Sequence, residues 1–154
     1  MARLKYLVIH CTATPEGREV TSAEIRHWHC DPKPRGNGWK QVGYTDMFHL
    51  NGGVERLVGN NEDAEVDPWE VTNGAAGYNS VSRHVVYVGG TDRDGNPKDT
   101  RTPEQRKAME RYVRNFHRKH PGVRIVGHRE LNPSKACPSF PVQKWLLEIG
   151  IKQD

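Results

Sequence analysis

Two short apolar segments, each with a histidine at or next to its carboxyl end, constrain the fold more than any other feature. Residues 4–11 (Leu-Lys-Tyr-Leu-Val-Ile-His-Cys) are apolar and β-branched over nearly their whole length, which predicts a buried strand. Residues 123–127 predict a second short strand, and His128 follows it directly. In an open sheet of parallel strands flanked by helices, binding sites form at the carboxyl ends of the strands. If the two strands are near neighbours, His10 and His128 therefore converge at one edge of the sheet.

The alternation of side chains along the first strand separates His10 from its neighbour Cys11. Successive strand residues point to opposite faces, so these two side chains are not expected to bind the same metal ion. We interpret Cys11 as a small residue of the core.

Capping boxes mark two helix starts. Thr21 with Glu24 predicts a helix that extends to about residue 29. Thr102, followed by Pro103 and Gln105, predicts a longer helix that stops at residues 121–122. A final helix is expected over residues 141–149, where a proline stands at the start and apolar residues recur at helical spacing.

The remaining segments complete an α/β pattern. Residues 44–50 and 54–59 flank Asn51-Gly52-Gly53 and predict a hairpin. Residues 81–88 predict another strand, whereas residues 30–43 and 60–79 read as loops. The order of elements predicts one α/β domain over residues 1–154, with a central mixed sheet of about five strands flanked by about three helices.

The loop over residues 127–138, which contains two prolines, brings a histidine, a lysine and a cysteine close together in the sequence. Zinc can be held by two imidazole nitrogens and one thiolate, with a fourth position open to water or substrate. His128 and Cys137 are candidates for two of these ligands. We assign the third to His10, at the end of the first predicted strand.

Two further groups of residues are candidates for this chemistry. His27, His29 and Cys30 are close in sequence, but His29 points away from His27 on a helix, so we expect no second zinc site there. Glu130 could act as a base, as in other zinc hydrolases. We interpret it instead as a structural carboxylate or one that orients a metal ligand.

Charge and composition limit the classes of partner. The net charge of +4 suits an anionic partner such as cell wall or nucleic acid. The basic residues are scattered, however, and helices rich in Lys and Arg with interleaved aromatics are absent, so we expect no nucleic-acid partner. No apolar run is long enough for a membrane span. The three cysteines are expected to be thiols.

The first residues carry basic side chains but no apolar stretch of the kind found in a signal peptide. We therefore expect synthesis in the cytoplasm without a signal peptide, and any work on the cell wall after release by another exit route. We also expect a monomer.

Six blocks, in order along the chain, resemble one family. The sequence resembles the zinc-dependent N-acetylmuramoyl-L-alanine amidases and, more narrowly, the small amidases of T-odd coliphages that are often called phage lysozymes. Animal peptidoglycan recognition proteins share that fold. The blocks that carry the resemblance are residues 8–14, 24–29, 42–44, 77–79, 88–90 and 133–140.

The resemblance implies a zinc (Zn2+) site of His10, His128 and Cys137, with Tyr44 and Lys135 beside it. The implied reaction is hydrolysis of the amide that joins the lactyl group of N-acetylmuramic acid to L-alanine in peptidoglycan or muropeptides. Lys135 would place a cation where the oxyanion forms. Tyr44 could donate a hydrogen bond to that oxygen or relay a proton, and the sequence leaves these roles open.

The sequence departs from the family pattern at two places. Thr45 and Asp46 follow Tyr44, where the family usually has histidine and an aromatic residue, and Asn73-Gly74 stands where the phage enzymes have a histidine. These departures keep open an alternative, a recognition module that binds muropeptide without cutting it. Cys137 argues against this alternative, because loss of the thiolate accompanies that behaviour in animal relatives. Coliphage relatives also bind an RNA polymerase, but no motif for such a surface is readable.

Overall fold

A five-stranded mixed sheet forms the centre of the computed structural model, which describes residues 2–153. The strand order is β5-β4-β7-β2-β9, in which only the edge strand β5 is antiparallel to its neighbour. This sheet confirms the predicted α/β class and strand number. The strands are β2 (Tyr6–Cys11), β4 (Asp46–Phe48), β5 (Val54–Arg56), β7 (Ser82–Tyr87) and β9 (Arg124–Gly127).

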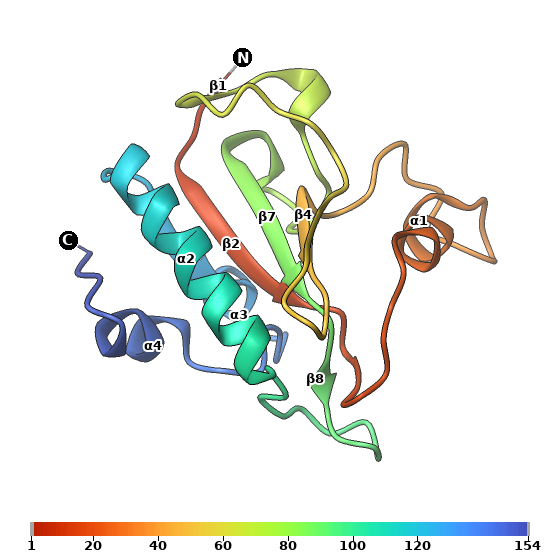
Figure 1. Cartoon of the computed structure of the whole chain (residues 1–154). Helices are drawn as coiled ribbons and strands as arrows, with labels where there is room; N and C mark the ends of the chain where they lie inside the picture. Colours follow the sequence, from red (N-terminus) through yellow and green to blue (C-terminus); the bar gives the residue numbers. More distant parts are fainter. Residues whose placement is uncertain (1, 154) are drawn as a thin grey trace.

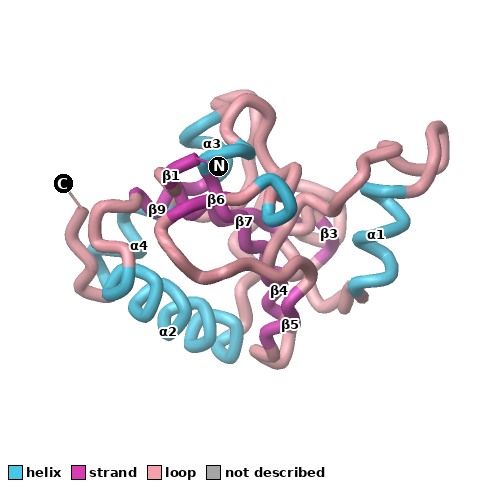
Figure 2. Tube along the Cα trace, turned by 90° about the horizontal axis from the view of Figure 1, so that it is seen from above, coloured by secondary structure: helices cyan, strands magenta, loops and turns pink. Residues whose placement is uncertain are grey.

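Helices cover both faces of this sheet (Figure 1). Helices α2 (Pro103–Lys119) and α4 (Val142–Glu148) lie on one face, and α1 (Ser22–Cys30) lies on the other. Figure 2 shows the same arrangement from above, with the strands between α2 and α1. Between residues 2 and 153 there are four α-helices rather than about three, because His128–Leu131 form the short helix α3 where a loop was predicted.

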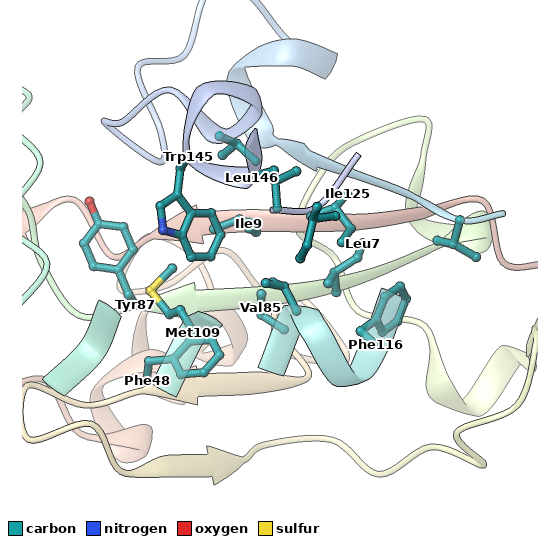
Figure 3. Close-up of a cluster of buried hydrophobic side chains, with 14 of the residues drawn as sticks. Leu7, Ile9, Phe48, Val85, Tyr87, Met109, Phe116, Ile125, Trp145 and Leu146 are labelled. Atoms are coloured by element: carbon teal, nitrogen blue, oxygen red, sulfur yellow. The ribbon is translucent and has the colours of Figure 1, made fainter. Parts of the chain in front are cut away.

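The larger part of the core lies between the sheet and helices α2 and α4 (Figure 3). Leu7 and Ile9 of β2 face these helices, and Cys11 belongs to the same cluster, as the alternation predicted. A smaller cluster under α1 contains Ile25 and Val86. The two clusters bury both faces of the parallel strands, which explains why their sequences are almost continuously apolar.

Both predicted capping boxes are present. The Thr21 hydroxyl accepts a hydrogen bond from the Glu24 amide at 3.1 Å, and the Thr102 hydroxyl accepts one from the Gln105 amide at 3.0 Å. The last helix begins one residue later than predicted, because Pro141 is its N-cap residue.

The hairpin at residues 51–53 is also present, but its strands are shorter than the predicted 44–50 and 54–59. Residues 60–79, predicted as loop, contain β6 (Glu65–Val66), the 3-10 turn η1 (Pro68–Glu70) and the start of η2 (Asn79–Val81). β6 pairs with β1 (Ala2–Arg3), and β3 (Thr14–Pro15) pairs with β8 (Gly90–Thr91).

None of the helices within residues 2–153 has the length and apolar character needed to cross a membrane.

Candidate metal centre

Two histidines meet at the carboxyl edge of the sheet because β2 and β9 are parallel neighbours. Ile9 pairs with Gly127, so His10 and His128 are the next residues on each strand's path. The two imidazole rings lie with their centroids 4.6 Å apart. The convergence predicted from the sequence is therefore present.

Cys137 reaches the same point through the loop that follows α3. The Arg129 amide donates a hydrogen bond to the Cys137 carbonyl at 2.8 Å, and the Cys11 amide lies 3.2 Å from the Cys137 sulfur. That sulfur is 3.7 Å from Nδ1 of His10. One donor atom from each of His10, His128 and Cys137 lies within 4.8 Å of the others, and no other such group occurs within residues 2–153. This cluster can bind a metal ion.

Burial keeps the imidazoles of the cluster neutral, the form that binds a metal. Burial and the neighbouring His84 and His128 hold the pKa of His10 well below its usual value. Burial and the Lys135 ammonium lower the pKa of His128. The hydrogen bond with the Cys11 thiol and burial raise the pKa of Cys137, so metal binding at this sulfur must release a proton.

Tyr44 and Lys135 lie on the same cavity as the three candidate ligands. The Tyr44 ring centroid is 5.2 Å from that of His10, and burial raises the pKa of its phenol above the usual range. Lys135 is exposed, in the loop between α3 and Cys137. All five residues singled out in the sequence thus line one cavity of about 720 Å³. The other lining residues are Cys11, Thr12, Ala13, Trp39, Lys40, Asn73, Gly74, Ala76, Asn79 and Asn132.

His84 is a residue of the site that was not predicted from the sequence. His84 lies on β7, fully buried, and its Nδ1 is 2.8 Å from Nε2 of His10. Burial lowers the pKa of His84 to about 3. A histidine inside the buried run Arg-His-Val-Val-Tyr was the only signal in the sequence. The departure at Gly74 is adjacent, because a Cβ there would lie 2.5 Å from Nδ1 of His84.

The alternative residues have other partners. His27 pairs with Asp31, and Nδ1 of His29 accepts a hydrogen bond from the Gly43 amide at 2.9 Å. Glu130 accepts hydrogen bonds from the Gly127 amide at 2.6 Å and from the Gln143 side chain at 3.0 Å. These contacts fit the structural interpretation of Glu130.

Comparison with known proteins identifies the family and agrees with the fold. The profile of the N-acetylmuramoyl-L-alanine amidase family matches residues 1–140. The endolysin of Enterobacteria phage K11 is 37% identical over 138 residues, covering 90% of this chain and 82% of the relative. The endolysin of Escherichia phage T7 is 34% identical over 139 residues, covering 90% of this chain and 83% of the relative.

A solved structure shares the fold over almost the whole chain. The Ph2119 endolysin from the Thermus scotoductus MAT2119 bacteriophage Ph2119 superposes with a TM-score of 0.73 at 24% identity, covering 99% of this chain and 88% of that one. The sequence match, the fold and the cluster lead to one conclusion. The chain belongs to the N-acetylmuramoyl-L-alanine amidase family and is an enzyme that hydrolyses an amide bond in peptidoglycan.

Proposed function

We propose that the reaction takes place at a zinc ion held by His10, His128 and Cys137. The observation that carries this proposal is the close approach of three donor atoms, all within 4.8 Å of one another, on the lining of the large cavity. Two imidazoles and one thiolate form a three-ligand set that leaves a fourth tetrahedral position for water or substrate.

The spacing and the chemistry of the donors fit a zinc ion. With Zn–N of about 2.05 Å and Zn–S of about 2.3 Å, tetrahedral geometry puts a nitrogen and a sulfur ligand about 3.6 Å apart. Nδ1 of His10 and the Cys137 sulfur are 3.7 Å apart. A buried imidazole kept neutral and a sulfur beside it are ligands that zinc prefers over harder oxygen-seeking cations.

The chain's own groups divide the remaining work of amide hydrolysis. When bound, zinc supplies a Lewis acid that polarises the carbonyl and lowers the pKa of a water molecule to about 7. The Lys135 ammonium, at the rim of the cavity, stabilises negative charge as it develops on the carbonyl oxygen. The Tyr44 phenol stays protonated, because burial raises its pKa, and it donates a hydrogen bond to that oxygen.

The substrate we propose is the amide between the lactyl group of N-acetylmuramic acid and L-alanine. Hydrolysis adds water across this bond, leaving a carboxylate on the sugar and a free amine on the peptide. The cavity is large enough for several units of sugar and peptide, and Lys40 and Lys135 line it. These cations suit the carboxylates of a stem peptide.

The proposal is tested with a purified muropeptide and the zinc-loaded protein. Mass spectrometry should detect N-acetylmuramic acid and a peptide with L-alanine at its amino end. Lys135→Gln should lower kcat by about 10²–10³-fold if the ammonium stabilises the oxyanion. Lys144→Gln, which removes an equal charge from an exposed position on α4, is the matched control and should keep the wild-type rate.

The recognition-module alternative predicts a different pair of results. Such a protein would bind the muropeptide without releasing either product, and it would need no stoichiometric zinc. Binding without cleavage by zinc-loaded protein would therefore refute the catalytic proposal and support the alternative.

A further inference from the structure

A line of three hydrogen bonds, of which the first is buried and the other two are partly buried, runs away from the metal cluster on the side of His10 that faces the protein interior. Nε2 of His10 lies 2.8 Å from Nδ1 of His84. Nε2 of His84 lies 3.0 Å from Oδ1 of Asn79. The same Oδ1 lies 2.9 Å from the amide nitrogen of Ala75. His84, Asn79 and Ala75 belong neither to the ligand set nor to the pair Tyr44 and Lys135.

The end of this line fixes the direction of every hydrogen bond in it. A backbone N–H can only donate, so the atom of Asn79 that faces the Ala75 amide must be the acceptor oxygen. That oxygen then accepts from N–H at Nε2 of His84. A neutral imidazole carries one N–H, so Nδ1 of His84 is an acceptor and takes its hydrogen bond from Nε2 of His10.

The consequence for His10 is a defined tautomer. With its proton on Nε2, Nδ1 of His10 carries a free lone pair, and this is the nitrogen that lies 3.7 Å from the Cys137 sulfur. The opposite tautomer would place a proton between His10 and the metal position and would set two acceptors against each other at His84.

The His84 ring is buried and packs closely against its neighbours. His84 pairs with Val8 of β2, two positions before the pair of Val86 with His10, so both imidazoles project from the same face of neighbouring strands. A Cβ at position 74 would come within 2.5 Å of Nδ1 and 2.6 Å of Cγ of His84. Both His10 and His84 are at most 1% exposed, so water does not replace either partner.

We propose that His84 is a positioning residue, which with Asn79 holds His10 in the tautomer that presents Nδ1 to the metal. The inference rests on the proposed zinc site and names the group that orients one of its ligands. Metal-binding histidines generally donate their second N–H to a carboxylate, a carbonyl or water, and loss of that partner typically costs 10–100-fold in metal affinity. In this chain a second imidazole takes that place.

The first test needs no substitution and no metal. Long-range 1H–15N spectra of the zinc-free wild-type protein distinguish the two tautomers of each histidine. The proposal predicts the Nε2–H tautomer for both His10 and His84. An Nδ1–H tautomer at either ring would overturn it, whether or not the protein binds zinc. Failure of the proposed zinc site would instead appear as a wild-type protein that takes up no zinc in equilibrium dialysis.

The second test separates the acceptor from the shape of the side chain. His84→Leu fills a similar volume without an acceptor, whereas His84→Gln offers a carbonyl oxygen to Nε2–H of His10. In competition with a chelator, the zinc dissociation constant should rise about 10–100-fold in His84→Leu and by a much smaller factor in His84→Gln. Equal dissociation constants in the two variants would mean that the acceptor atom at position 84 has no influence on zinc binding, and would overturn the proposal.

A third variant covers the case in which changes at His84 prevent folding. Asn79 is only half-buried, and Asn79→Ala leaves both imidazoles in place while it removes the acceptor that sets the direction of the line. The proposal predicts a mixture of tautomers at His84 and weaker zinc binding. Wild-type spectra and wild-type affinity in Asn79→Ala would contradict it.

Discussion

Substituting Gly74 by alanine tests how tightly the loop before η2 packs against His84. The added Cβ would lie 2.5 Å from Nδ1 of His84 and 2.9 Å from the Gly43 carbonyl oxygen, whereas ordinary contacts begin at 3.4 Å. Gly74 is not among the residues with positive φ, so alanine brings no backbone strain there. Any effect must therefore come from the contact itself.

The expected loss in the free energy of unfolding follows from the size of this overlap. The ring must move by roughly 1 Å, and overpacking of a buried site costs about 1–3 kcal/mol. That movement also breaks the 2.8 Å hydrogen bond between His84 and His10, which contributes about 1 kcal/mol more. For a chain of this length, a loss of about 2–4 kcal/mol lowers Tm by roughly 5–15 °C. Urea and thermal unfolding of the zinc-free protein, followed by circular dichroism, measure both quantities.

Two controls separate the contact with His84 from other effects of an added methyl group. Gly122→Ala adds the same methyl group where no atom lies within 4 Å, so its free energy of unfolding should change by less than about 0.5 kcal/mol. In a His84→Ala background, at least half of the cost of Gly74→Ala should disappear, because the ring is gone. Equal costs for Gly74→Ala and Gly122→Ala, or an unchanged cost in that background, would refute the packing argument.

Two further predictions concern stability away from the cavity. Thr102→Ala removes the side chain that caps α2 and accepts from the Gln105 amide, so urea unfolding should show a loss of about 1–2 kcal/mol, and an unchanged midpoint would contradict this. Burial lowers the pKa of His49, but hydrogen bonds to Glu19 and Glu55 outweigh burial and raise this pKa overall. The stabilisation by protonated His49 is therefore fully present below the unfolded-state pKa of about 6.5 and is lost as pH rises through the raised folded-state pKa. The stability difference between wild type and His49→Gln, below about 1 kcal/mol at pH 6, should therefore shrink towards pH 8, and a difference that grows with pH would have the wrong sign.

The parts of the fold that the sequence predicted are those with a strong local signal. The two apolar strands that carry His10 and lead to His128 could be predicted directly, and the convergence of these histidines follows from the rule that parallel strands share a carboxyl edge. The capping boxes at Thr21 and Thr102 placed two helix starts to the residue. Local hydrogen bonds and periodicity suffice for such features.

The parts that were missed depend on contacts between distant segments. β1 and β6 are two residues long, and only their pairing with each other makes them strands. The turn of helix at His128 is too short to show a helical period. His84 lies 74 positions from His10, and its role depends on the adjacency of β7 and β2 and on the space left by Gly74. No local pattern carries that information.

X-ray absorption at the zinc edge shows whether two imidazoles and one thiolate hold a single zinc ion. On protein loaded with zinc and freed of excess metal, we expect one zinc per chain, with one sulfur ligand at about 2.3 Å and nitrogen ligands at about 2.0–2.1 Å. In Cys137→Ser the sulfur scattering should vanish and most of the zinc should be lost. A wild-type protein without zinc, or a zinc spectrum without sulfur, would contradict the assignment of His10, His128 and Cys137.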